Sequence, residues 1–65
     1  IDINSAPVED LQRLPGIGEK RAQAIVAWRE EHGPFQSVDE LVQVSGIGEK
    51  LLAGLRDYAA AGPVG

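Results

Sequence analysis

Apolar residues recur along this chain at helical rather than strand spacing. In the first half they fall three or four residues apart over residues 8–14 and 19–32, and in the second half over residues 38–44 and 49–61. Such spacing places side chains on one face of an α-helix, whereas strict alternation would indicate a strand. The pattern therefore predicts four helices over these ranges and an all-α fold.

The ends of these helices carry recognisable signals. Pro15-Gly16 stops the first helix and Gly33-Pro34 stops the second, because proline cannot continue a helix and glycine suits its C-terminus. Ser37 and Glu40 have the spacing of a capping box at the start of the third helix. Short helices are marginal in water by themselves, so residues 8–14 must pack on the longer helix that follows.

A five-residue sequence, Gly-Ile-Gly-Glu-Lys, occurs at residues 16–20 and again at residues 46–50. The same offset aligns Leu11 with Leu41 and Trp28 with Tyr58. A repeated unit of this length usually cannot bury its apolar face without its neighbour. We therefore predict a single domain over residues 1–65 in which two helix–turn–helix units are related by a pseudo-two-fold axis. Unit one covers about 4–32, a linker 33–36, unit two about 37–61 and a short tail 62–65.

The aromatic residues are expected to belong to the core. Trp28 and Tyr58 follow Ile25 and Leu55 at helical spacing, which directs them inward rather than outward as platforms for stacking on bases. Phe35 lies in the linker, where we expect it to fill the seam between the two units.

The two Gly-Ile-Gly turns are the candidate functional feature. Glycine permits left-handed backbone angles and close approach of another group, and the isoleucine between the glycines is expected to point inward. The helix that follows each turn begins with unpaired N–H groups and a partial positive charge, which favour an anion. A tight turn without a ligand is the alternative, but two copies with lysine at the same offset count against it. The sequence thus predicts phosphate binding at Gly16, Ile17, Gly18, Lys20, Arg21, Gly46, Ile47, Gly48 and Lys50.

Other chemistries do not fit. A dinucleotide-binding fingerprint needs a third glycine where Arg21 stands, and a nucleotide-hydrolase phosphate loop needs Gly-Lys-Ser/Thr. The chain has no cysteine, and His32 is its only histidine, so no cluster has the spacing of zinc ligands. His32 is expected to complement the C-terminus of a helix. We therefore predict no catalytic residue and no enzymatic activity.

The net charge of −4 has the wrong sign for a nucleic-acid-binding protein, which usually carries a basic face. Most carboxylates fall in the first turns of the predicted helices, where the helix macrodipole favours them. Screening at physiological ionic strength also weakens charges that lie more than about 8 Å from a phosphate. Glu19 and Glu49 adjoin the turns, however, and we expect them to weaken anion binding.

Residues 11–25 resemble the helix-hairpin-helix motif, with the pattern Leu11-x-x-Leu14-Pro15-Gly16-Ile17-Gly18-x-x-x-Ala22-x-x-Ile25. The tandem arrangement, the opening Ile3-Asn4-Ser5-Ala6 and the stretch from Trp28 to Val38 are similar to the ComEA family of competence proteins, over residues 1–60. The resemblance implies a DNA receptor used in natural transformation, which binds double-stranded DNA without sequence preference through hairpin N–H groups. It also implies an extracytoplasmic location, periplasmic or tethered by an upstream membrane anchor. Because the chain starts at Ile1 rather than methionine, we expect it to be a piece of a longer protein.

The resemblance further implies a monovalent cation, K⁺ or Na⁺, at each hairpin, with no other cofactor required. Its ligands would be the main-chain carbonyls of Gln12, Leu14 and Ile17 in the first copy and of Val42, Val44 and Ile47 in the second.

The chain also departs from the family pattern. Ser45 stands where many relatives have lysine, and Arg56 is the only basic residue near the end of the last helix. Together with the net acidity, these departures favour an alternative function, a protein-interaction module that has kept the fold and lost DNA binding. The sequence does not identify a protein partner.

Overall fold

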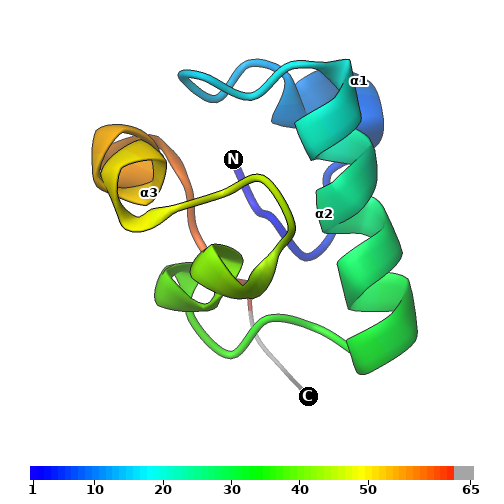
Figure 1. Cartoon of the computed structure of the whole chain (residues 1–65). Helices are drawn as coiled ribbons and strands as arrows, with labels where there is room; N and C mark the ends of the chain where they lie inside the picture. Colours follow the sequence, from blue (N-terminus) through cyan, green and yellow to red (C-terminus); the bar gives the residue numbers. More distant parts are fainter. Residues whose placement is uncertain (63–65) are drawn as a thin grey trace.

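The chain folds into helices joined by tight turns, as a computed structural model describes for residues 1–62 (Figure 1). The elements in order are α1 (Val8–Leu11), α2 (Glu19–His32), the 3₁₀ helix η1 (Val38–Gln43), α3 (Glu49–Leu55) and the 3₁₀ helix η2 (Arg56–Tyr58). Over this range no strand forms, and the only extended pairing is an isolated parallel bridge between Asp2 and Ala60. The predicted all-α class is confirmed. Residues 63–65 of the predicted tail lie outside the described part.

Helix α2 matches the prediction at both ends. It begins after Gly18 and ends at His32, where Gly33 adopts a φ of 89° and donates its N–H to the Arg29 carbonyl. A positive φ of this size favours glycine, so the predicted stop signal is a conformational requirement.

The first short helix is shorter than predicted, because α1 ends at Leu11 rather than at Leu14. Beyond it the chain continues in tighter turns, in which the Leu14 N–H donates to the Leu11 carbonyl at 3.1 Å. Pro15 disfavours α-helical backbone at the residue before it, so the end of the helix contracts into turns that close after three residues.

The third predicted helix, over residues 38–44, is the 3₁₀ helix η1 and ends at Gln43. Its valines have restricted side-chain rotamers in an α-helix, which lowers the helical propensity of so short a segment. The predicted capping box is wrong as well. Ser37 makes no side-chain cap, and the Glu40 carboxylate accepts the N–H of Gln36 instead.

The fourth predicted helix, over residues 49–61, is wrong beyond α3 and η2. After Tyr58 the backbone is extended, and Ala60 pairs with the N-terminal segment. The Ile3 N–H donates to the Ala60 carbonyl at 2.9 Å, and the Ala60 N–H donates to the Ile1 carbonyl at 2.8 Å. These long-range hydrogen bonds replace those that a longer helix would have formed.

One apolar core runs through both halves of the chain, and its largest fully buried side chains are Phe35, Ile3, Leu11, Leu14, Ile25, Leu41 and Leu55. Phe35 is therefore buried, as predicted. Trp28 is half-buried and stacks on Phe35, with ring centroids 4.4 Å apart. The inward placement predicted for Tyr58 is wrong, because its side chain is 61% exposed. Since the α-helical backbone ends at Leu55, the helical stripe no longer sets the direction of Tyr58.

The N-terminal segment is an integral part of this core, although its sequence carries no periodic signal. Ile3 is fully buried, and its carbonyl accepts a hydrogen bond from the Arg29 guanidinium at 2.8 Å. The Asn4 side chain donates to the Phe35 carbonyl at 3.0 Å and accepts the Phe35 N–H at 2.7 Å. These two hydrogen bonds fix the position of the linker relative to the N-terminal segment.

Asp2 joins the two ends of the described chain. Its carboxylate accepts the N–H of Asn4 at 2.9 Å and the N–H of Gly62 at 3.0 Å. Because these N–H groups, first that of Asn4 and then that of Gly62, bind the charged form, they lower the pKa of Asp2 below its usual value.

Candidate nucleic-acid interface

The first hairpin joins α1 to α2 and turns at Gly16. Its φ of 78° lies in the left-handed region, which favours glycine. The Ile17 N–H donates to the Leu14 carbonyl at 3.0 Å and closes the turn, while the Ile17 side chain is buried in the core. Gly18 follows in an extended conformation, with φ −90° and ψ −173°, as the residue before α2.

The second hairpin repeats this geometry between η1 and α3. Gly46 has a φ of 90°, and the Ile47 N–H donates to the Val44 carbonyl at 3.1 Å. Ile47 is buried, and Gly48 is extended, with φ −99° and ψ 178°. The prediction that both isoleucines point inward is confirmed. The two turns therefore share one local structure, while the pseudo-two-fold relation of the whole units stays a prediction.

Both helices that follow the hairpins start without a side-chain cap. The first paired N–H groups are those of Ala22, which donates to the Gly18 carbonyl at 2.9 Å, and of Leu52, which donates to the Gly48 carbonyl at 3.0 Å. Among the described residues, the N–H groups at 19–21 and 49–51 thus have no acceptor. Unpaired N–H groups and the positive end of a helix dipole form a favourable position for an anion.

The four hairpin glycines divide into two kinds. A Cβ at Gly16 would overlap the side chain of Leu51, and its φ also disfavours other residues. At Gly18 and Gly48, by contrast, the backbone is extended, and no described atom lies within 4 Å of an added Cβ. Neither packing nor conformation within the fold requires glycine at these two positions. Glycine there leaves the backbone N–H groups accessible from outside.

Two reciprocal contacts hold the hairpins side by side. Arg21 donates from Nε to the Gly46 carbonyl at 2.8 Å, and the Leu51 side chain lies against Gly16. Arg21 and Leu51 occupy equivalent positions in the two copies of the repeat. Figure 1 shows the same arrangement, in which each hairpin loop reaches toward the second helix of the other unit. Arg21, predicted to bind phosphate, therefore also positions the second hairpin.

A hollow of about 410 Å³, the hairpin hollow, lies between the start of α2 and the second hairpin and is lined by Lys20, Arg21, Ala24, Ser45 and Gly46. Two cationic side chains and a hydroxyl face it, and no carboxylate lines it. Ser45 and Ala24 were not predicted as site residues. Their place at the hollow follows from the contact between the two hairpins, which local sequence patterns do not show.

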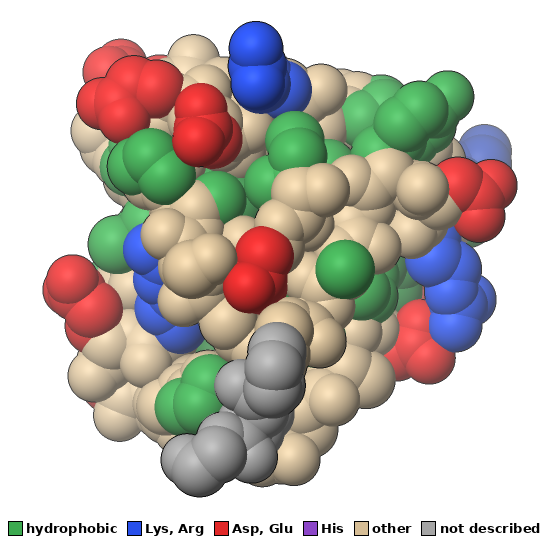
Figure 2. All heavy atoms as spheres, turned by 180° about the vertical axis from the view of Figure 1, so that it is seen from behind, with side chains coloured by type: hydrophobic (Ala, Val, Ile, Leu, Met, Phe, Trp, Pro, Cys, Tyr) green, Lys and Arg blue, Asp and Glu red, His purple; other side chains and the backbone are tan. Residues whose placement is uncertain are grey.

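Charges of both signs are mixed on the surface of the molecule. Figure 2 shows one face of the molecule, on which Asp and Glu side chains lie interspersed with Lys and Arg, and no continuous basic area covers that face. In the second unit Arg56 pairs with Asp39, which leaves Lys50 as the cation beside Glu49. Binding of an anion therefore depends on backbone N–H groups and a small number of cations.

The structure supplies no side-chain site for a metal ion within residues 1–62, since no group of three or more His, Cys, Asp or Glu residues is suitably placed. Over the same range no helix is long and apolar enough to cross a membrane. Of the carbonyls predicted to hold K⁺ or Na⁺, that of Val42 belongs to η1 and the others lie in the turns, where those of Leu14 and Val44 already accept one N–H each. A carbonyl oxygen has two lone pairs, so one remains on each.

Comparison with known proteins places this geometry in a family context. The family model described as a helix-hairpin-helix motif matches residues 1–59. The chain is 50% identical over 50 residues to ComE operon protein 1 of Bacillus subtilis, a match that covers 77% of this chain and 24% of that protein. It is 52% identical over 48 residues to kinesin-like protein KIF22 of Rattus norvegicus, covering 74% of this chain and 7% of that protein.

A third relative is an uncharacterized protein of Haemophilus influenzae, 45% identical over 58 residues that cover 88% of this chain and 52% of that protein. The chain thus spans at most about half the length of these curated relatives.

Proposed function

Because the chain belongs to the helix-hairpin-helix family, we propose that it binds DNA without sequence preference, through backbone N–H groups of both hairpins on phosphates. The observation that supports this most directly is the backbone conformation and exposure of Gly18 and Gly48. Both are extended, open to solvent and placed before uncapped helices, although the fold itself does not require glycine there. A phosphate oxygen needs this kind of access to reach backbone N–H groups.

The side-by-side hairpins suit double-stranded DNA. In the proposed complex each hairpin receives a phosphate of one strand, and Lys20 and Lys50 add point charges beside the two positions. The Arg21–Gly46 hydrogen bond keeps the hairpins at a fixed separation, which reduces the ordering needed on binding.

The expected affinity is modest, because Glu19 and Glu49 oppose the nearby cations. With one or two phosphates neutralised per hairpin, the logarithm of the binding constant should fall with the logarithm of salt by about 0.9 per phosphate. The dissociation constant should lie in the range of non-specific binding, about 10⁻⁴ to 10⁻⁶ M at physiological salt.

The biological role that we propose is that of a DNA receptor in natural transformation. It rests on the resemblance to the ComEA family and on the 50% identity to ComE operon protein 1. The domain would then act outside the cytoplasmic membrane, as a periplasmic protein or held by an anchor elsewhere in the full protein. It would have no catalytic role, and K⁺ or Na⁺ at the hairpin carbonyls would support the turns.

An NMR titration of the ¹⁵N-labelled chain with a short duplex at low salt tests the proposal. We expect amide shifts at residues 16–20 and 46–50, and weaker shifts with single-stranded DNA of the same sequence. Lys50→Ala should weaken binding more than Arg56→Ala. The two variants change the net charge equally, but Arg56 is already paired with Asp39.

The alternative is a protein-interaction module that has lost DNA binding. The net charge of −4 and the serine at position 45 favour it. It predicts that neither hairpin responds to a saturating amount of duplex, and that outcome would refute the DNA-binding proposal.

A further inference from the structure

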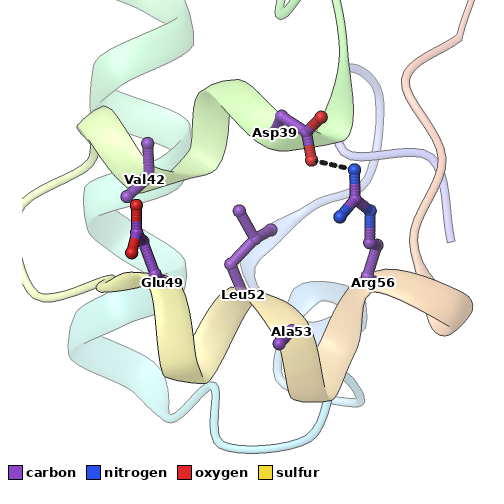
Figure 3. A pocket seen from close by; sticks show the side chains of 6 residues that line it. All are labelled: Asp39, Val42, Glu49, Leu52, Ala53 and Arg56. Carbon is purple, nitrogen blue, oxygen red and sulfur yellow. Dashed lines mark ion pairs between the residues drawn. The ribbon is translucent and has the colours of Figure 1, made fainter.

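A second hollow lies away from the hairpin hollow, between η1 and α3 (Figure 3). It has a volume of about 340 Å³ and is lined by Asp39, Val42, Glu49, Leu52, Ala53 and Arg56. It shares no lining residue with the hairpin hollow.

This second hollow, called the groove below, is apolar in its middle. Leu52 extends from α3 toward η1 and is largely buried, while Val42 on η1 is 41% exposed, which makes it one of the few large apolar side chains at the surface (Figure 3). Ala53 adds a small apolar side on α3. An aliphatic side chain entering between Val42 and Leu52 would therefore bury apolar surface on both elements.

The first unit does not carry this apolar surface. The repeat places Gln12 at the position equivalent to Val42 and Gln23 at the position equivalent to Ala53, and all four positions are exposed. The fold therefore accepts polar residues at these two positions, and Val42 and Ala53 are neither in the core nor among the partly buried side chains packed against it. Together with Leu52 they form a contiguous apolar lining, and contiguous apolar surface is typical of a binding site.

The charged residues at the ends of the groove indicate what enters it. At one end Arg56 is neutralised by its ion pair with Asp39 (Figure 3). At the other end the Glu49 carboxylate extends toward Val42, and it forms no ion pair within residues 1–62. A carboxylate without an ion-pair partner disfavours a phosphate backbone in the groove and favours a cation there.

We propose that the groove binds a short segment of a partner protein, which places an aliphatic side chain between Val42 and Leu52 and a lysine or arginine against Glu49. The contact is small, so it belongs to the weak, transient class, with a dissociation constant on the order of 10⁻⁴ M. The groove shares no lining residue with the hairpin hollow, although Glu49 also belongs to the first turn of α3, whose N–H groups we assign to a phosphate.

The test is an NMR titration with a short, end-blocked peptide of alternating leucine and lysine. We expect shifts at residues 42, 49, 52 and 53, and none of comparable size from peptides in which glutamate replaces lysine or serine replaces leucine. Shifts spread over the whole surface, or equal shifts from the glutamate peptide, would overturn the proposal. Concentration-dependent shifts of the same residues in the protein alone would also overturn it, because a second copy would then cover the groove.

Three variants complete the test. Val42→Gln, which introduces the residue that unit one carries, should weaken peptide binding about tenfold. Glu49→Gln should weaken it about threefold, as expected for an exposed ion pair. Ala53→Gln, which likewise introduces the residue that unit one carries, should leave the duplex titration unchanged. Peptide binding that is indifferent to Val42→Gln would overturn the proposal without affecting the proposed DNA binding.

Discussion

Replacing Gly18 by aspartate is expected to stabilise the fold and weaken DNA binding at the same time. The residue precedes α2 in an extended conformation that any amino acid adopts, no described atom lies within 4 Å of an added Cβ, and no side chain caps the helix. Aspartate is among the preferred residues at such a position, because its carboxylate accepts the N–H groups of the first turn.

The stabilisation can be estimated from its parts. A carboxylate at a helix start contributes about 0.3–1 kcal/mol, and removing the freedom of glycine in the unfolded chain contributes about 0.4–1 kcal/mol. Repulsion from Glu19 offsets part of this, and aspartate and glycine at an N-cap differ by only a few tenths of a kcal/mol, so we expect about 0.5 kcal/mol. In a domain of this size a gain of about 0.5 kcal/mol raises Tm by about 2–4 °C.

The effect on binding has the opposite sign. The new carboxylate occupies the N–H groups that we assign to a phosphate and adds a negative charge beside it. Losing a hydrogen bond to a charged group costs about 1.5–3 kcal/mol, which corresponds to a loss of about ten- to a hundredfold in affinity. Thermal unfolding followed by circular dichroism and fluorescence anisotropy with a labelled duplex measure the two effects separately.

Ala27→Glu is the matched control for charge. Ala27 is exposed on α2, and nine residues of helix place it about 13.5 Å from Gly18, beyond the screening length of about 8 Å. Gly18→Asn distinguishes the effect of occupying the N–H groups from the effect of the added charge, since asparagine accepts the same N–H groups and stays neutral. If Gly18→Asp binds duplex no more weakly than Ala27→Glu, the N–H groups of the first hairpin are not the phosphate site.

Three further predictions concern the fold. Gly16→Ala should cost about 2–4 kcal/mol, because it adds a steric overlap to the strain of a positive φ, whereas Gly46→Ala should cost about 1–2 kcal/mol from the strain alone; equal losses in urea denaturation would contradict this. Phe35→Ala should cost about 3–5 kcal/mol, a large part of a total stability of about 3–10 kcal/mol, while Tyr58→Ala should change stability by less than about 0.5 kcal/mol. A large effect at Tyr58 in the same denaturation series would show that its side chain is packed. Because the pKa of Asp2 is lowered in the folded state, its stabilisation is present above the unfolded pKa of about 3.9 and is lost as pH falls through the lower folded value. Asp2→Asn should therefore flatten the acid side of the stability–pH curve, and an unchanged acid side would refute this role.

Helix α2 was predictable from local signals at both ends, since it starts behind the Gly-Ile-Gly turn and stops at Gly33-Pro34. The other helices were overestimated because their ends depend on neighbours. Pro15 contracts the end of α1, and the chain after Tyr58 pairs with the N-terminal segment instead of continuing as a helix. A periodic pattern cannot show that a hydrogen-bonding partner from the other end of the chain is available.

At the candidate site, too, local geometry was predictable from the sequence and contacts between distant residues were not. The repeated glycines and buried isoleucines identify two equal turns, and their local geometry agrees with that prediction. Sequence alone does not tell that Gly16 is required by packing while Gly18 is not. It also does not show that Arg21 reaches across to Gly46, because that contact joins residues from different units.

The pairing of Ile1 and Ile3 with Ala60 also bears on how the protein is made. Ile3 belongs to the centre of the core, yet its N–H finds its acceptor only when nearly the whole chain is present. During synthesis Ile1 and Ile3 therefore lack these backbone partners until Ala60 has left the ribosome. Because contacts between segments so distant in sequence slow folding, the domain can complete its core only after residue 60 has been made.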